Sequence, residues 1–310
     1  MKARDYERVR SALFASPSPR GAPSPSSPEN GGSLVRQPDF KALLRAFPWA
    51  SYDTLVSIYS QDCVARVKQA YVVHRRPDKV AEYCERWVGG ETLAGMSEAL
   101  DFPPCSLVRI LLPSLLGPGV QGKLTKIFND PDHLLSLCRD EGDGGLPPEV
   151  SASSVDLTRL VADVRACIER DHVTSPLVAS LKRSVGLEYE SLLSTLLSSA
   201  GIAYESESDL RKKGATKTPD ALLKIPILVG NHVVHWIDSK ACFCSEDLYY
   251  NDGIRQFRQY VNRFGSGLVI YWFGFIEDLP SEESILVLDA FPTQVTRLRL
   301  CGAAREAEAA

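Results

Sequence analysis

The feature that most constrains the fold of this 310-residue chain is an apolar run, LVIYWFGF, at residues 268–275. A strand with one face in water alternates apolar and polar side chains, whereas a strand covered on both faces does not. We therefore expect residues 268–275 to form an inner strand of a sheet. Because helices must cover both faces of such a sheet, the run places this part of the chain in the α/β class.

The segments on both sides of this run fit that class. Residues 220–229 and 232–240 predict two strands joined at Gly230-Asn231, a dipeptide typical of hairpin turns. The other elements expected here are helices at 187–200 and 248–264 and short strands at 202–205 and 285–288. This order predicts a mixed central sheet flanked by helices.

The N-terminal half is expected to be helical, because apolar residues recur at helical spacing from Leu34 to about Asp140. Within it, residues 92–100 and 106–116 predict two helices separated by a turn at Pro103-Pro104, the arrangement of a helix-turn-helix module. An ordinary helical bundle gives the same pattern, so both interpretations stay open.

These patterns predict how the chain is divided. Residues 16–33 are rich in Ser and Pro and carry too little apolar surface to offset the entropy of ordering. The expected segments are a partly disordered start at 1–33, a helical domain at 34–140, a linker at 141–154, connecting helices at 155–185, an α/β domain at 186–300 and a disordered tail at 301–310.

Composition sets the broad class of protein. A hydrophobic content of 44% is ordinary for a globular protein, and a net charge of −4 provides no overall positive field to attract nucleic acid. Eight cysteines are scattered along the chain, and no apolar run approaches the about 20 residues that cross a bilayer. We therefore expect a soluble, intracellular protein with reduced thiols.

Polar residues interrupt the predicted hairpin at one end. Asp220 begins the first strand, and Asp238 and Lys240 end the second. Side chains alternate along a strand, so Asp238 and Lys240 share a face while Ser239 points away. The hairpin brings Asp220 alongside that face, so two carboxylates and an ammonium group are expected to converge.

This set of side chains suits phosphoester chemistry. Two carboxylates give oxygen ligands to a hard divalent cation and leave positions for water and a phosphate oxygen. A lysine beside the cation can hold the attacking water or offset the charge of the transition state. A surface ion pair is the plain alternative for an isolated Asp-x-Lys, but the Pro219-Asp220 pair on the neighbouring strand favours the catalytic interpretation.

Residues 186–300 resemble the nuclease domain of the codanin-interacting nuclease family, also called the TPD family after the tripeptide at 218–220. The matching segments are GLEYESLL, KTPDALL, HWIDSK, RQFRQYVNRFG and GLVIYWFGFI. The resemblance extends more weakly back to about Phe40, where the family carries helix-turn-helix regions. It implies a restriction-endonuclease-like PD-(D/E)XK fold that cleaves nucleic acid, with DNA as the expected substrate and Mg²⁺ or Mn²⁺ as cofactor.

The same resemblance implies a codanin-like protein partner, a link to chromatin or histone handling, and a location in nucleus and cytoplasm. A catalytically silent module that holds this partner is the rival interpretation. The intact set of Asp220, Asp238 and Lys240 favours an enzyme, because drift in a silent module would have eroded it.

The resemblance also implies roles for single residues. Asp220 and Asp238 become metal ligands together with the backbone carbonyl of Ser239, and Lys240 becomes the catalytic lysine. The family carries a glutamate where this chain has Asp238, and the shorter side chain would shift the metal by about a bond length.

The preceding helix offers one more catalytic and metal-binding carboxylate, from either Glu188 or Glu190. Two residues apart, they cannot both face the site from a regular helix. Glu190 shares a face with Leu193 and Leu197, which should pack on the sheet, so we prefer Glu190.

Other candidates support this site or compete with it. Gln256 and Tyr260, at i and i+4, share one helix face and fit a Gln-x-x-x-Tyr pattern of some such nucleases, although ordinary surface residues explain them as well. Tyr271, Trp272 and Phe273 could stack on bases, but a buried strand explains them more economically. A zinc site from His232, His235, Cys242 and Cys244 is disfavoured, because histidines three residues apart on a strand point to opposite faces.

Two groups of basic residues are candidates for contact with a nucleic-acid backbone. Arg211, Lys212 and Lys213 lie just before the first hairpin strand. Arg66, Lys68, Arg75 and Arg76 lie in the helical region, where ordinary solvated charges are the slightly better explanation.

Overall fold

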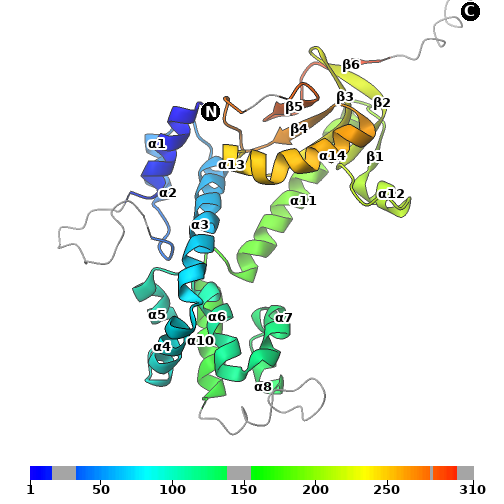
Figure 1. The fold of residues 1–310 in the computed structure, drawn as a ribbon. Helices are drawn as coiled ribbons and strands as arrows, with labels where there is room; N and C mark the ends of the chain where they lie inside the picture. The colour runs from blue at the N-terminus through cyan, green and yellow to red at the C-terminus, as the bar shows by residue number, and fades with distance from the viewer. Residues whose placement is uncertain (16–32, 138–154, 280–281, 299–310) are drawn as a thin grey trace, which may run out of the picture. The chain divides into compact units, whose positions relative to one another are not determined.

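The computed structural model of the chain describes residues 1–15, 33–137, 155–279 and 282–298 (Figure 1). Two compact units are present. The sheet unit comprises Met1–Arg10, Leu44–Ile58 and Arg183–Ala310, and the helical unit comprises Ser11–Leu43 and Tyr59–Lys182. The expected linker, the tail, and most of the expected disordered start lie outside the described residues.

The described part of the chain before residue 176 is helical (Figure 1). Its helices are α1 (Ala3–Leu13), α2 (Phe40–Ala46), α3 (Tyr52–His74), α4 (Pro77–Val88), α5 (Leu93–Leu100), α6 (Pro104–Leu116), η1 (Pro118–Lys123), α7 (Leu124–Asn129), α8 (His133–Leu137) and α10 (Leu157–Arg170). The expected helical character is confirmed, whereas α1 and α4 were not anticipated as separate helices.

The helix pair expected at 92–116 is formed by α5 and α6, which bend by 120° about the turn at 101–103. Thr92 caps α5, and Asp101 closes it in the left-handed conformation with φ 48°. Most of α6 is buried, which leaves it little surface to place in a DNA groove. The geometry therefore favours the bundle interpretation, and DNA reading by this pair stays a prediction.

Among the described residues, no single helix is long and apolar enough to cross a bilayer. Only α5 and α6 taken together, bent by 120°, have the necessary length and composition.

One long helix, α11 (Pro176–Ser199), joins the end of the expected connecting helices at 155–185 to the helix expected at 187–200. Gly186, the expected start of the α/β domain, therefore lies inside a helix. A glycine there costs about 1 kcal/mol relative to alanine, and burial of Leu193 and Leu197 outweighs that cost. The boundary between the compact units, after Lys182, also falls within this helix.

The sheet has six strands in the order β1-β2-β3-β4-β5, with β6 paired to β2. These are β1 (Tyr204–Ser206), β2 (Ala221–Val229), β3 (His232–Lys240), β4 (Gly267–Tyr271), β5 (Ile285–Leu288) and β6 (Thr296–Arg297). Strands β1, β2, β3 and β6 pair antiparallel, while β3, β4 and β5 pair parallel. The expected mixed sheet is confirmed, with β4 buried at every position.

Each face of the sheet has its own apolar cluster. On one face, Ile237 and Ile270 pack with Leu193 and Leu197 of α11. On the other, Trp236 and Val269 pack with the helix α14 (Ile254–Phe264). Alternation along β3 therefore puts Asp238 and Lys240 on the α14 face and Ser239 on the α11 face.

The strand expected at 268–275 is shorter than predicted, and the helix expected at 248–264 is interrupted. Strand β4 stops at Tyr271, and a turn follows at Trp272–Gly274, where Gly274 has φ 90°. The helix expected at 248–264 is split into α13 (Glu246–Leu248), a π-helical turn η2 (Tyr249–Gly253), and α14. A side chain at Gly253 would lie 3.0 Å from the hydroxyl of Tyr271, so close helix-to-sheet approach accompanies this wider turn.

The contact between Trp236 and the backbone of β4 generates a stability prediction. A methyl group on Gly267 would lie 2.1 Å from Cε2 of the fully buried Trp236. Gly267→Ala should therefore lower the free energy of unfolding by roughly 1–3 kcal/mol, as overpacking does. Urea unfolding followed by circular dichroism measures this.

The matched control is Gly186→Ala, since nothing lies within 4 Å of a methyl group at that position. It should be neutral or stabilising by roughly 0.5–1 kcal/mol, because alanine favours the helix. Equal midpoints for Gly267→Ala and the parent chain would contradict the close packing of Trp236.

Candidate active site

The two aspartates lie opposite one another on neighbouring strands. The β2–β3 ladder pairs Ala221 with Ile237, so its continuation sets Asp220 against Asp238. Residues directly opposite in an antiparallel pair project from the same face with Cβ atoms about 5 Å apart. The backbone N–H of Ser239 donates to Oδ2 of Asp220 at 2.7 Å, which fixes this carboxylate at the end of the hairpin.

Lys240 completes the cluster. Its Nζ lies 2.6 Å from Oδ2 of Asp238, whose side chain is 1% exposed. The contact is an ion pair without the alignment of a hydrogen bond, so this buried oxygen has no aligned donor among the described residues. The Nζ atom also lies 5.8 Å from the ring centroid of Phe257 on α14. The structure therefore brings Asp220, Asp238 and Lys240 together.

Burial dominates the electrostatics of this cluster, and the charge of Asp238 adds to it at Asp220. Burial, followed by the charge of Asp238, raises the pKa of Asp220 to about 8. Burial also raises the pKa of Asp238, against the opposing effect of Lys240. For Lys240 burial alone would lower the pKa, but the two aspartates outweigh it and the pKa is raised. Two carboxylates that resist ionisation are a site prepared for added positive charge.

A cavity of about 310 Å³ adjoins Asp220 and contains a third carboxylate. Glu190 of α11 lines this cavity, whereas Glu188 does not. Burial, Glu207 and Asp238 raise the pKa of Glu190 in that order, so its carboxyl group senses the charges of the site. This geometry supports the preference for Glu190 over Glu188, and the role of Glu190 stays a proposal.

Glu207 is a site residue that the sequence argument missed. It opens the short helix α12 (Glu207–Lys212), lines the same cavity as Glu190, and accepts hydrogen bonds from Arg211 and Thr218. Its only sequence signal is an acidic residue one position after Ser206, which caps α12. That position is typical of an ordinary helix start and does not point to an active site.

Gln256 and Tyr260 support the strand that carries Asp220. Nε2 of Gln256 donates to the hydroxyl of Tyr260 at 2.6 Å, and this hydroxyl donates to the carbonyl of Thr218 at 2.8 Å. Burial, followed by the charge of Asp238, raises the pKa of Tyr260 to about 12. The chain of bonds holds the backbone two residues before Asp220, which fits a supporting role for the Gln-x-x-x-Tyr pair.

The donor set suits Mg²⁺ or Mn²⁺ better than zinc. The described residues contain no group of three His, Cys, Asp or Glu side chains arranged around one metal position. A tetrahedral zinc site needs four converging side chains. His232, His235, Cys242 and Cys244 do not form such a group. Mg²⁺ is commonly held by one or two carboxylates and completed by water and phosphate, which Asp220 and the unaligned oxygen of Asp238 could provide.

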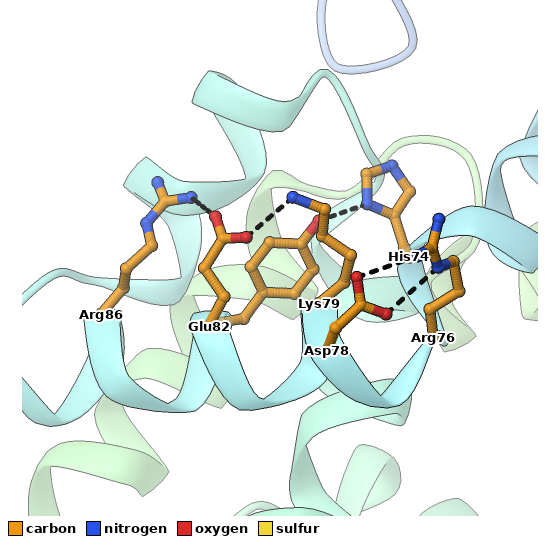
Figure 2. A network of polar contacts seen from close by, with 7 residues as sticks. His74, Arg76, Asp78, Lys79, Glu82 and Arg86 are labelled. Atoms are coloured by element: carbon orange, nitrogen blue, oxygen red, sulfur yellow. Dashed lines mark hydrogen bonds and ion pairs between the residues drawn. The ribbon is translucent and has the colours of Figure 1, made fainter.

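Most of the basic candidates already have acidic partners. Arg66, Arg76, Arg211, Lys212 and Lys213 form ion pairs with Asp62, Asp78, Glu207, Asp209 and Glu205, respectively. Figure 2 shows such a network along α4, where Arg76 pairs with Asp78 and Glu82 lies between Lys79 and Arg86. Lys68 and Arg75 have no such pair among the described residues. A continuous positive track for a phosphate backbone is therefore absent from the described part of α4.

Tyr271, at the end of β4, and Trp272 and Phe273, in the turn after it, pack against other side chains and are not free to stack on bases. Tyr271 is 1% exposed, and Nε1 of Trp272 donates to Oγ of Ser239 at 2.8 Å. The ring of Tyr189 lies 5.4 Å from Trp272 and 5.3 Å from Phe273. This packing agrees with the structural interpretation of the three residues.

The chain is similar to a known protein family and to proteins named as nucleases. A family described as "Protein of unknown function TPD sequence-motif" matches residues 156–291. CDAN1-interacting nuclease 1 of Xenopus laevis is 36% identical over 278 residues, covering 84% of this chain and 84% of the relative. The proteins of that name from Mus musculus and Homo sapiens are 35% and 34% identical over 271 residues, covering 83% of this chain and 89% of each relative. No solved structure matches the chain.

The raised pKa of Asp220 predicts how stability depends on pH. Below about pH 4 this carboxyl group is protonated in both folded and unfolded chains, so it imposes no penalty. Between its ordinary value of 3.8 and about 8, only the unfolded chain ionises freely, and the folded state loses stability as pH rises. Without divalent cations, Asp220→Asn should raise the melting temperature at pH 8 by at least about 2 °C, the shift that about 1 kcal/mol produces in a domain of about 150–250 residues.

The control for this prediction has the opposite sign. The side-chain hydrogen bond from Ser206 lowers the pKa of Asp209, so its charge stabilises the fold above the ordinary pKa. Asp209→Asn should therefore lower the melting temperature at pH 8, with a smaller difference at pH 3. Calorimetry from pH 3 to pH 8 measures both variants, and an Asp220→Asn chain that melts below the parent at pH 8 would contradict the account.

Proposed function

The chain belongs to the family of CDAN1-interacting nucleases, and we propose that it hydrolyses phosphodiester bonds of nucleic acid, with DNA as the substrate. The observation that carries the proposal is the placement of Asp220 against Asp238, with Lys240 at 2.6 Å from the second carboxylate. The order of these residues on one hairpin fits a PD-(D/E)XK nuclease. The relatives are named as nucleases, which supports the same reaction class.

In this proposal Asp220, Asp238 and the backbone carbonyl of Ser239 hold Mg²⁺ or Mn²⁺. The cation would supply Lewis-acid activation of water and of the phosphoryl group. A bound cation would favour the ionised form of both carboxylates, and the raised pKa of Asp220 supports release of a proton from this residue near neutral pH. The hydrogen bond from Ser239 N–H keeps Asp220 in place during this change.

Lys240 has a different task. Its ammonium group is protonated across the physiological range, since both aspartates raise its pKa. With a cation held at Oδ2 of Asp238, the ammonium group of Lys240 would be available to donate to the attacking water or to a phosphoryl oxygen. Donors that face developing negative charge stabilise the transition state more than the ground state.

Glu190 and the Gln256–Tyr260 pair complete the proposed machinery. The carboxyl group of Glu190 senses the same charges and would act as a proton acceptor at the edge of the site. Gln256 and Tyr260 are positioning residues, because they act through the Thr218 carbonyl rather than on the substrate.

We also propose that the chain binds a CDAN1-like protein, as the name of its relatives says of them, and that it works in the nucleus and cytoplasm. Partner binding and cleavage are separable, since a silent module would keep the first without the second. The residue set of the hairpin favours an active enzyme.

Cleavage of labelled DNA and RNA tests the enzyme directly. Purified parent chain should cleave in Mg²⁺ or Mn²⁺ and not in EDTA. Asp238→Asn and Lys240→Met should each reduce the rate at least about a hundredfold, as removal of one group that stabilises transition-state charge does. Single-stranded, duplex and branched substrates in one panel identify the preferred form.

The matched controls repeat each substitution on an exposed position of the same sheet. Asp289→Asn follows β5 and Lys224→Met lies on β2, and both should keep the parent's rate. Equal cleavage by the parent, Asp238→Asn and Lys240→Met would trace the activity to a contaminant and refute the enzymatic proposal.

The two glutamates of α11 offer a second comparison. Glu190→Gln should lower the cleavage rate roughly tenfold or more, within the range for proton transfer or charge stabilisation. Glu188→Gln should leave the rate within about twofold, because Glu188 does not line the cavity beside Asp220. Rate constants under single-turnover conditions separate the two, and a larger loss in Glu188→Gln would reverse the assignment.

A further inference from the structure

The helical unit contains a second cavity, of about 610 Å³, between α4 and α6. Pro77, Val80, Ala81 and Cys84 of α4 recur at helical spacing along one wall. The opposite wall includes Arg109, Ile110 and Pro113 of α6, and Tyr71 and Arg75 of α3 lie at one end. The volume is within the range of about 300–1,000 Å³ typical of ligand sites. The proposed nuclease machinery uses none of these residues.

The charge of this cavity is of one sign. Arg75 and Arg109 line it, and none of the described residues that line it is acidic. Arg109 is held in place, because its guanidinium lies 4.4 Å from the ring centroid of Phe128 and its Nη1 donates to the carbonyl of Thr174 at 3.2 Å. Arg75 is exposed, and its guanidinium has no hydrogen bond or ion pair with any described residue. One fixed and one free guanidinium on an otherwise uncharged wall complement an anionic occupant.

The surrounding surface argues against a nucleic-acid backbone as that occupant. The face of α4 turned away from the cavity carries its own acids, and Figure 2 shows Asp78 and Glu82 paired with Arg76, Lys79 and Arg86. A phosphate backbone runs on for many charges and needs a continuous basic track. Arg75 and Arg109, which have no acidic neighbour in the cavity lining, lie in one concave site and not along a track.

A peptide fits the same place better. Apolar walls from Val80 and Ile110 suit an aliphatic or aromatic side chain, and Val88, one turn beyond Cys84 on α4, is 58% exposed. Pro113 lies inside α6 and has no N–H for the carbonyl of Arg109. That carbonyl lacks its usual helical donor, and Arg109 and Pro113 both line the cavity.

We infer that this cavity is the docking site for an acidic, apolar segment of the CDAN1-like partner. The inference rests on the partner-binding part of the proposed function and is independent of the cleavage part. A carboxylate of the segment pairs with Arg75 and Arg109, and a neighbouring apolar side chain fills the space between α4 and α6.

The experiment compares full-length variants in binding to purified CDAN1 protein by biolayer interferometry. Arg75→Glu reverses the free charge and should weaken binding roughly tenfold or more, as expected for loss of a charged hydrogen bond. Arg76→Glu makes the same change one residue away, outside the cavity lining, and should stay within about twofold of the parent. Ala81→Glu introduces a carboxylate on the α4 wall and should weaken binding by a similar factor to Arg75→Glu.

Each outcome decides the inference, provided circular dichroism shows that the variants melt like the parent. Parent-like binding by both Arg75→Glu and Ala81→Glu, with CDAN1 bound by the parent, overturns the docking site while leaving the proposed partner intact. Failure of the parent itself to bind CDAN1 removes the partner proposal and this inference together. Loss of duplex DNA binding in Arg75→Glu with CDAN1 binding retained would assign the cavity to nucleic acid and overturn the inference.

Discussion

The pairing of β2 with β3 is the constraint on which the site depends. It brings two carboxylates to one end of a hairpin, where burial raises the pKa of both and the charge of Asp238 raises that of Asp220 further. Such a pair is unfavourable unless positive charge compensates it. Lys240 compensates part of the negative charge through Oδ2 of Asp238. A divalent cation would compensate the negative charge that remains.

The rest of the sheet unit can be understood as support for this pair. Strand β4 is buried on both faces and anchors β3 in parallel, so the end of β3 cannot move independently. Helix α14 holds the Thr218 carbonyl through Tyr260, and the N–H of Ser239 holds Asp220. Burial of the two aspartates lowers the stability of the fold, and the apolar clusters on both faces of the sheet offset this cost.

Local patterns were enough to predict the hairpin and the approach of Asp220, Asp238 and Lys240 at one end of it. The Gly230-Asn231 turn pairs Val229 with His232, but the register shifts between Leu222 and Ile227. The turn alone therefore does not decide which side chains meet at the far end, where Ala221 pairs with Ile237. Tertiary contacts decided the features that the sequence argument missed. Helix α1 is short and polar, but Val9 is fully buried and the ring of Tyr6 stacks 5.7 Å from Phe243. Glu207 approaches the site only because β1 and α12 fold back beside Asp220.

The most direct test is calorimetric titration of the parent chain with Mn²⁺ at pH 7 in two buffers of different ionisation enthalpy. With the pKa of Asp220 at about 8, cation binding should release protons, so the measured heat should depend on the buffer. The account predicts binding with proton release in the parent and neither in a chain with both Asp220 and Asp238 changed to Asn. Binding of equal strength in the doubly substituted chain would contradict a cation site at this pair of aspartates.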